Sequence, residues 1–121
     1  VLKALVLGEI GAEAVVAPQC LYEYYVVATR PLEANGLGYR PQYAREMLSA
    51  LVHEFKLLPD NERITNEWLR LINQYNVSGK PAHDARLVAW MRAHDVGQLL
   101  SLNPADFQRY APAELALVPL G

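Results

Sequence analysis

The alternation of strands and helices in this chain begins with residues 14–29, AVVAPQCLYEYYVVAT. The first four of these residues are small or β-branched, which is typical of a short buried strand. Pro18 follows directly, and proline is well tolerated at the first position of a helix, where its missing N–H would have no intrahelical partner. Apolar side chains then recur at helical spacing. We therefore expect a strand over Ala14–Ala17 and a helix over Gln19–Thr29.

The rest of the chain continues this pattern in both directions. Helical spacing of apolar residues predicts further helices, and proline and glycine mark the connections between them. Strands that alternate with helices predict a mostly parallel sheet covered on both faces, and hence an α/β fold. The further predicted helices are Val1–Ile10, Pro41–Phe55, Glu62–Tyr75 and Pro81–His94, the predicted strands or extended segments are Lys56–Pro59, Gln98–Leu102 and Leu115–Val118, and Asn103–Tyr110 is a short turn or helix.

Length and composition indicate one folded domain. The chain has 121 residues, of which 52% are hydrophobic and 20% charged, values that are ordinary for a globular protein. The net charge of -2 argues against a protein that coats nucleic acid by bulk electrostatics. Cys20 is the single cysteine, so no internal disulfide can form and we expect a reducing, cytoplasmic location. We expect neither a membrane-spanning segment nor a signal peptide.

Three carboxylates follow strand-like or turn segments. Glu23 follows the first strand, Asp84 opens a helix after a turn, and Asp106 follows a strand near the C-terminus. In open parallel sheets the functional crevice lies beyond the carboxyl ends of the strands. Carboxylate oxygens are preferred ligands of Mg²⁺ and Mn²⁺, and such ions can assist phosphodiester hydrolysis. The three acids are therefore candidates for one divalent-metal site.

Each of these acids also has a purely structural interpretation. Asp84 lies in the first turn of its helix, where the helix dipole favours a negative charge. Asp106 is the third helical residue if Asn103 is the N-cap, an arrangement that resembles a capping box. Glu23 lies in the middle of a helix and has the pattern of a half-exposed surface acid. Spacing alone leaves both interpretations open.

Basic and aromatic side chains near the acids offer further candidates. Lys80, Arg30 and Arg86 are candidates for contacts with phosphate, and an ordinary solvated surface is the alternative. We expect His83 to orient a neighbour at the start of its helix rather than to bind metal. Trp68 is expected to lie in the core.

Three segments resemble motifs of the PIN-domain family. Residues 18–31, PQCLYEYYVVATRP, resemble its PQ-x-L-x-E-x-x-x-V-x-TRP segment. Residues 77–89, VSGKPAHDARLVA, are similar to its GK-x-x-HDA-x-LVA segment. Residues 100–107, LSLNPADF, are similar to its L-(T)-x-N-x-x-DF segment. The order and spacing of the motifs also match, and the resemblance spans essentially the whole chain.

The resemblance implies a single PIN-like domain with a three-layer α/β/α fold and a parallel sheet. Many members are VapC-type toxins, which cut single-stranded or tRNA-like RNA with Mg²⁺ or Mn²⁺ and are silenced by a cognate antitoxin. It further implies that Glu23, Asp84 and Asp106 are catalytic and metal-site residues, with Asn103 at the edge of the site. The expected partners are an RNA substrate, an antitoxin protein and a second copy of the chain in a homodimer.

The resemblance departs from the family at its start. The family opens with a central strand that ends in Asp-Thr-Asn or Asp-Ser-Asn, and this sequence contains no such string. Residues 1–10 instead resemble the helix that follows that strand. We expect a chain that starts at Val1 to bind metal poorly and to fold less securely. A catalytically inactive PIN-like module that binds RNA or protein is therefore one alternative, and an α/β interaction protein whose acids are helix caps is another.

Overall fold

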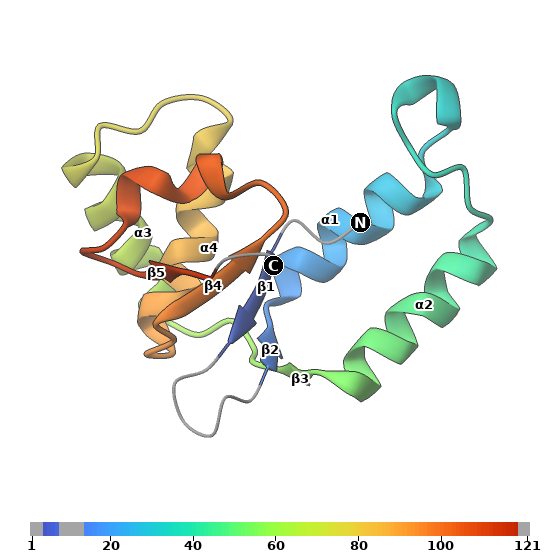
Figure 1. The fold of residues 1–121 in the computed structure, drawn as a ribbon, viewed down its shortest axis with the longest axis horizontal. Coiled ribbons are helices and arrows are strands. Elements are labelled where there is room, and N and C mark those ends of the chain that lie inside the picture. The colour runs from blue at the N-terminus through green and yellow to red at the C-terminus, as the bar shows by residue number, and fades with distance from the viewer. Residues whose placement is uncertain (1–3, 8–13, 119–121) are drawn as a thin grey trace.

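The computed structural model describes residues 4–7 and 14–118 of the chain. Within these residues, five short strands form one sheet in the order β3-β2-β1-β4-β5 (Figure 1). The strands are β1 (Ala4–Leu7), β2 (Ala14–Val16), β3 (Lys56–Leu57), β4 (Gln98–Ser101) and β5 (Ala116–Leu117). The helices are α1 (Pro18–Thr29), α2 (Pro41–Glu54), α3 (Arg63–Gln74) and α4 (Pro81–Ala93), with 3-10 helices η1 (Leu32–Ala34) and η2 (Pro104–Tyr110). This mixed arrangement is compatible with the α/β class expected from the sequence.

The sheet combines parallel edges with an antiparallel centre. β2 pairs with β3 in parallel, and β4 pairs with β5 in parallel. β1 lies between β2 and β4 and runs antiparallel to both. β2, β3, β4 and β5 therefore share one direction, as a mostly parallel sheet requires, and β1 runs against them. No helix among the described residues is long and apolar enough to cross a membrane.

The helix predicted over Val1–Ile10 is wrong where the structure describes it, because Ala4–Leu7 form β1. A four-residue apolar run fits a strand as well as a buried helical turn, so its local pattern does not discriminate between the two. Pairing decides the outcome: Val6 lies opposite Val15 of β2 on one side and opposite Leu99 of β4 on the other. Residues 1–3 and 8–10 of that prediction lie outside the described residues.

The strand–helix unit at residues 14–29 has the predicted form. Pro18 occupies the start of α1, and Ala17 before it has an extended backbone. Tyr24 and Ala28, spaced by one helical turn, are buried on one side of α1. The helix ends before Arg30, which precedes a proline and has the extended backbone that such a residue favours.

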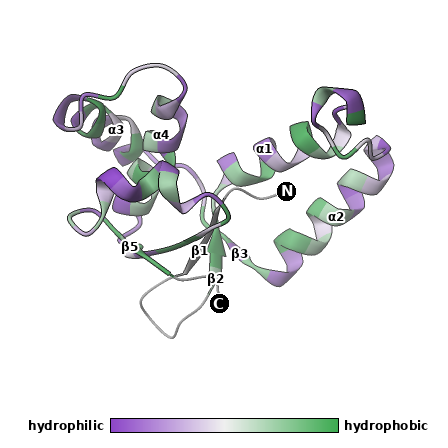
Figure 2. Ribbon diagram, turned by 45° about the horizontal axis from the view of Figure 1, so that its top comes forward, coloured by the Kyte–Doolittle hydropathy of each residue, from purple (hydrophilic) through white to green (hydrophobic). Residues whose placement is uncertain are grey.

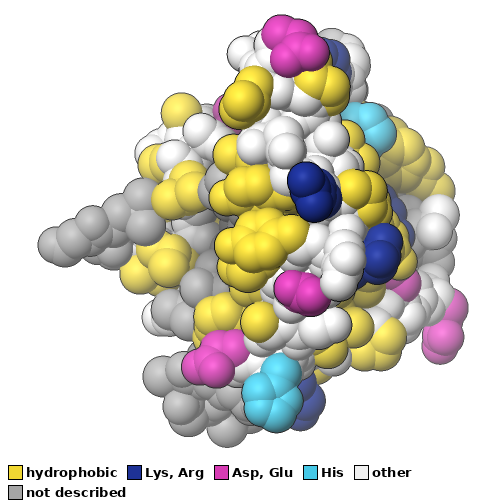
Figure 3. Space-filling view, turned by 90° about the vertical axis from the view of Figure 1, so that its right-hand side faces the viewer, with side chains coloured by type: hydrophobic (Ala, Val, Ile, Leu, Met, Phe, Trp, Pro, Cys, Tyr) yellow, Lys and Arg dark blue, Asp and Glu magenta, His cyan; other side chains and the backbone are white. Residues whose placement is uncertain are grey.

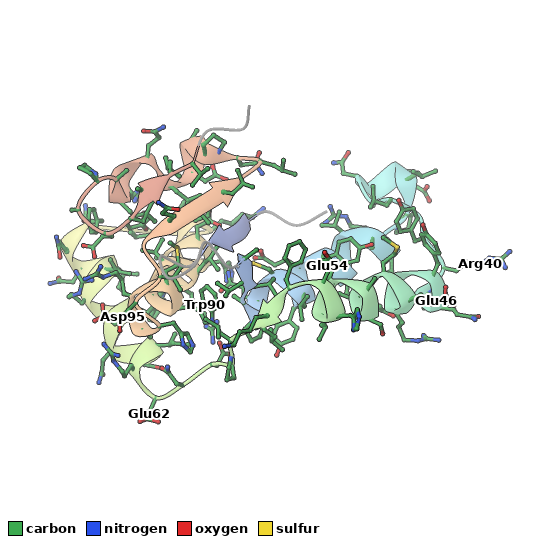
Figure 4. The ribbon with its side chains drawn as sticks, turned by 60° about the horizontal axis from the view of Figure 1, so that its bottom comes forward. Arg40, Glu46, Glu54, Glu62, Trp90 and Asp95 are labelled. Carbon is green, nitrogen blue, oxygen red and sulfur yellow. The ribbon has the colours of Figure 1, made fainter. Side chains whose placement is uncertain are left out.

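The main core lies around α4, whose central residues are buried on all sides. A helix that is hydrophobic all round must be enclosed by other elements, and α4 packs against both α3 and η2. Trp90 points into this interior (Figure 4), is fully buried, and donates from Nε1 to the carbonyl oxygen of Leu58 at 2.9 Å. Other fully buried large side chains are Leu71, Met91, Leu99, Phe107 and Tyr110.

α2 packs mainly on α1, and the two helices form an arm beside the main body (Figure 1). Hydrophobic and hydrophilic residues alternate along α2, as an amphipathic helix requires (Figure 2). Ala44 is the only buried residue of α2, however. The apolar side chains of Met47 and Val52 remain 38% and 44% exposed. Amphipathic spacing predicts an apolar face, and only the neighbouring elements decide how much of it is covered.

An ion-pair network joins the segment after η2 to α3. The buried carboxylate of Glu114 accepts hydrogen bonds from Arg70 at 2.8 and 3.1 Å and from the Tyr75 hydroxyl at 2.9 Å. Arg92 Nε lies 3.4 Å from Glu114 Oε1. The bond from Arg70 holds the pKa of the Glu114 carboxyl below its usual value, burial acts in the opposite direction, and Tyr75 lowers the pKa further. No local pattern marks Glu114 in the sequence, because its partners Arg70, Tyr75 and Arg92 come from distant parts of the chain.

Candidate functional site

Two helices begin side by side at the carboxyl edge of the sheet. β2 and β4 run in the same direction, so the segments that follow them leave from the same edge. α1 follows β2 directly. Its second residue, Gln19, donates from Nε2 to the carbonyl oxygen of His83 at 2.8 Å. This bond places the start of α4 beside the start of α1.

The Gln19 amide connects three candidate residues. Gln19 is buried, with 9% of its surface exposed, and its Nε2 lies 3.5 Å from Oε2 of Glu23. Its Oε1 accepts from Nη1 of Arg86 at 3.4 Å. One side chain therefore orients the half-buried Glu23 carboxylate relative to the first turns of α4. Gln19 was not predicted as a site residue; the signal in the sequence is its position one helical turn before Glu23.

A further acid, Asp60, joins this edge after β3. Its Oδ2 lies 3.2 Å from Nη2 of Arg86. Both side chains are 39% exposed, so the pair contributes at most about 1 kcal/mol to stability. Its main effect is geometric, because it holds the Arg86 guanidinium between β3 and α1. Asp60 also follows an extended segment, which is the pattern that identified the other acids.

These side chains surround a surface pocket of about 350 Å³. The pocket brings together a carboxylate, a guanidinium, an imidazole and an amide, all of which bind polar or charged groups. An arrangement of this kind suits a ligand that carries both hydrogen-bond donors and negative charge, such as a nucleotide. The lining residues are Gln19, Tyr22, Glu23, His83 and Arg86.

Asp84 lies in α4 and Asp106 in η2, two elements that pack against each other. Asp84 is half-buried in the first turn of α4. Burial raises the pKa of the Tyr110 phenol, Arg109 lowers it, and the nearby Asp84 carboxylate raises it again. α4 packs against η2, which carries the exposed Asp106 in its first turn.

Asp106 was also interpreted as part of a capping box at the start of η2, in which the N-cap side chain would bond the backbone of the first turn. The structure shows no such bond from the N-cap residue. Asn103 is the N-cap of η2, as expected, and Pro104 follows it. Among the residues that the structure describes, the side chains at the N-caps of η2 and α4, Asn103 and Lys80, make no capping hydrogen bond. Asn103 and Asp106 are both exposed. They lie beyond β4, in the position relative to the sheet that the sequence analysis predicted.

The predicted three-acid metal site is not assembled by the side chains. Within residues 4–7 and 14–118, no group of three or more His, Cys, Asp or Glu side chains is placed to hold a metal ion. Glu23 lies beside the polar pocket, whereas Asp84 and Asp106 lie toward η2. The described acids therefore do not fit a complete three-ligand metal centre. They do concentrate negative charge along one edge of the sheet.

The three candidate phosphate-binding cations lie in different surroundings. Arg86 belongs to the polar pocket, and Lys80 is exposed at the N-cap of α4. Arg30 follows α1 seven residues after Glu23, which places it about 10 Å further along the helix axis. Its Nη2 donates to the carbonyl oxygen of Asn35 at 2.9 Å. Arg30 therefore holds the loop after α1 and lies away from the acids.

An apolar groove of about 950 Å³ lies between α1 and α2. Hydrophobic side chains gather on the face of the molecule that carries these helices (Figure 3). Tyr22 and Val26 of α1 are 66% and 58% exposed there. Exposed apolar surface of this kind is typical of a region that binds another protein segment. The groove is lined by Leu21, Tyr22, Tyr25, Val26, Arg45, Leu48, Ser49, Val52 and His53.

The sequence matches no protein-family model. It also matches no protein of established annotation. The functional interpretation therefore depends on the residues and the geometry described above.

Proposed function

We propose that this protein is a PIN-type endoribonuclease that binds RNA at the carboxyl edge of its sheet and cuts it with Mg²⁺ or Mn²⁺. The proposal includes the three-layer α/β/α arrangement and the cytoplasmic location expected from the sequence. The observation that carries it is the hydrogen bond from Gln19 to His83. This bond brings the helix that bears Glu23 against the helix that bears Asp84.

Convergence of the three motif segments supports the proposal. Residues 18–31 and 77–89 are far apart in the chain, and they meet through Gln19 and His83. Residues 77–89 and the η2 region meet through the packing of α4 against η2. Segments that converge at the carboxyl edge of a sheet are the usual source of a binding site in α/β proteins.

The charges at this edge suit a phosphodiester substrate. Arg86 and Lys80 provide positive charge for phosphate, while Glu23, Asp84 and Asp106 provide acidic groups. A divalent ion held there would supply an activated water and stabilise the leaving oxygen, although the described acids do not by themselves form a group of three metal ligands. The chain's own contribution is to hold the RNA backbone at Arg86 and to orient Glu23 through Gln19.

The test is cleavage of a mixed pool of single-stranded RNA with Mg²⁺ by the wild-type chain and by three variants, Glu23→Gln, Asp84→Asn and Asp106→Asn. We expect each variant to lose at least about 100-fold in rate, the usual scale for a group that stabilises a transition state, while it melts at the wild-type temperature. Glu54→Gln is the matched control, because Glu54 lies on α2, away from the edge (Figure 4). Equal cleavage by Asp84→Asn and wild type contradicts the proposal, and unfolding of Asp84→Asn supports the capping interpretation.

The second candidate is a PIN-like module that binds RNA without cutting it. A specific observation favours it: the described residues contain no group of three or more metal-binding side chains. Calorimetric titration with Mg²⁺, combined with RNA binding in the absence of cleavage, separates the candidates. Tight RNA binding with no measurable Mg²⁺ affinity and no product supports the module and contradicts the nuclease.

The expected protein partners remain part of the proposal. They are a cognate antitoxin and a second copy of the chain. The groove between α1 and α2 supports this part, because its apolar side chains are exposed in the isolated chain. A partner helix or strand that covers Tyr22 and Val26 would remove this apolar surface from water.

A further inference from the structure

A second concave site lies between the first turns of α3 and α4. It has a volume of about 370 Å³, large enough for an aromatic ring system. Its walls combine apolar surface with a hydroxyl, an imidazole and a guanidinium, so it offers both stacking and hydrogen bonds. The lining residues are Ile64, Thr65, Trp68, Ala82, His83 and Arg86.

Trp68 forms an aromatic wall of this cleft. Trp68 was expected to lie in the core; it packs against the core but is only half-buried. Its Nε1 donates to the carbonyl oxygen of Ala82 at 2.9 Å. This bond satisfies the polar group of the indole and fixes the ring against α4, so the remaining ring surface is apolar and held in place. A ring that is fixed in advance loses little entropy when a flat ligand stacks on it.

The cleft shares a wall with the polar pocket. His83 and Arg86 line both sites, and Glu23 lies in the polar pocket only. A phosphate group at the polar pocket would therefore have an apolar, aromatic cleft directly beside it. RNA has the same alternation of a charged phosphate and a flat base. The guanidinium of Arg86 is held in position by Asp60 and Gln19.

We infer that this cleft binds one unpaired nucleobase of the RNA, stacked on Trp68 and hydrogen-bonded by Thr65, His83 or Arg86. Proteins commonly read single-stranded RNA by stacking splayed bases on aromatic side chains. A base fits better than an aliphatic protein side chain, because a base can use the polar groups of the wall as well as the ring surface of Trp68. The inference rests on the proposed function, since it names the part of the RNA that the same edge recognises.

Intrinsic fluorescence provides a direct measurement. The chain has two tryptophans, and Trp90 is fully buried with its Nε1 bonded to Leu58. Quenching by a ligand therefore reports on Trp68. The full chain is titrated in EDTA, which removes divalent ions and stops metal-dependent cleavage, with AMP, CMP, GMP, UMP and a short single-stranded RNA. We expect saturable quenching in the wild type, and loss of that quenching in Trp68→Phe.

Two variants measure the affinity for the same RNA by fluorescence anisotropy. Loss of one stacked base predicts a roughly 5- to 150-fold weaker complex for Trp68→Ala. Thr65→Val has nearly the same shape but no hydroxyl, and loss of one hydrogen bond predicts a roughly 2- to 10-fold weaker complex. Leu69→Ala is the matched control, because Leu69 is 50% exposed on α3 and does not line the cleft. Melting curves verify that each variant folds.

The outcomes separate this inference from the proposed function. Weaker binding by Thr65→Val and Trp68→Ala, with Leu69→Ala unchanged, supports the cleft whether or not RNA is cut after Mg²⁺ is added. Cleavage with wild-type RNA affinity in both variants overturns the inference and leaves the nuclease intact. Thr65→Val decides the matter if Trp68→Ala fails to fold. Equal competition by double-stranded RNA of the same sequence also overturns the inference, because its bases are not available for stacking.

Discussion

Gln19 and His83 are 64 residues apart in the sequence, and the side-chain amide of the first donates to the backbone carbonyl of the second at 2.8 Å. The bond links two of the three motif segments. It also places Glu23 and Arg86 around one polar pocket. The position of the candidate site therefore depends on one buried amide.

Replacement of Gln19 tests this dependence. Gln19→Leu removes the side-chain hydrogen bond to the His83 carbonyl, which still accepts from the backbone of α4, so we expect the free energy of unfolding to fall by about 0.5–1.5 kcal/mol. The control is Gln42→Leu, because Gln42 is exposed on α2 and makes only a 3.5 Å contact with Glu46. That change should cost less than about 0.5 kcal/mol. Urea denaturation measures both, and equal costs would show that the Gln19 bond is unimportant.

The Glu114 network predicts a pH-dependent contribution to stability. The pKa of Glu114 is lowered in the folded state, chiefly by Arg70, so its stabilisation is present above the unfolded pKa and is lost as pH falls through the folded value. We expect Glu114→Gln to cost about 2 kcal/mol at pH 7, less than a fully buried pair would, because Arg70 is 39% exposed. Urea denaturation from pH 7 to pH 3 should show the difference from wild type shrinking.

Glu67→Gln is the control for this network. Glu67 also pairs with Arg70, but its side chain is 27% exposed compared with 6% for Glu114. We expect it to cost less than about 1 kcal/mol at every pH. A cost for Glu114→Gln that did not change with pH would contradict the ionic explanation and would indicate a packing effect.

The packing of α3 on α4 predicts a large difference between two leucines on one helix. Leu71 is fully buried, so Leu71→Ala leaves a cavity and should cost about 2–5 kcal/mol. Leu69 is 50% exposed, and Leu69→Ala should cost less than about 0.5 kcal/mol. Both changes alter helix propensity alike, so the difference between them isolates burial. Thermal denaturation measures both, and similar melting temperatures would mean that α3 does not pack as described.

The groove between α1 and α2 predicts a change in association without a change in folding. Val26 is 58% exposed in the groove, so Val26→Lys should leave the free energy of unfolding of the monomer within about 0.5 kcal/mol. A charge in an apolar contact is costly, and we therefore expect the variant to remain monomeric at concentrations at which the wild type self-associates. Analytical ultracentrifugation measures this. Leu69→Lys, outside the groove, is the control, and association of Val26→Lys at the wild-type level would exclude this face as the dimer interface.

Local signals in the sequence predicted most element positions. Pro18, Pro41 and Pro81 each occur at the start of a helix, as the fixed φ of proline and its missing N–H favour. These starts depend on a few neighbouring residues, so they can be identified without the tertiary structure. The strand Ala4–Leu7 could not be identified in this way. Its short apolar run has no clear local preference, and it forms a strand because β2 and β4 pair with it on both sides.

The candidate site was only partly accessible to the same reasoning. Glu23 was identified from its place after a strand, and it lines the polar pocket in the structure. Asp60 and Gln19 were not identified as site residues, although they hold Arg86 from two sides. Trp68 was assigned to the core because its apolar character suggested burial. Its partial exposure depends on how closely α3 approaches α4, and this distance is a property of the packed fold.

The amino-acid sequence by itself determined where most helices and strands lie and which acids follow the strands, because these features depend on local spacing and backbone preference. Only the tertiary structure decided which side chains meet. Each residue along a helix turns the side chain by about 100°, so neighbouring residues of α4 have different surroundings: His83 lines the polar pocket, whereas the Asp84 carboxylate raises the pKa of the Tyr110 phenol on η2. Helix rotation and packing depend on residues far apart in the chain. From the order of strands alone, Glu23, Asp84 and Asp106 were expected to share one site, but the packed helices place Glu23 at the polar pocket and the two aspartates elsewhere along the same edge.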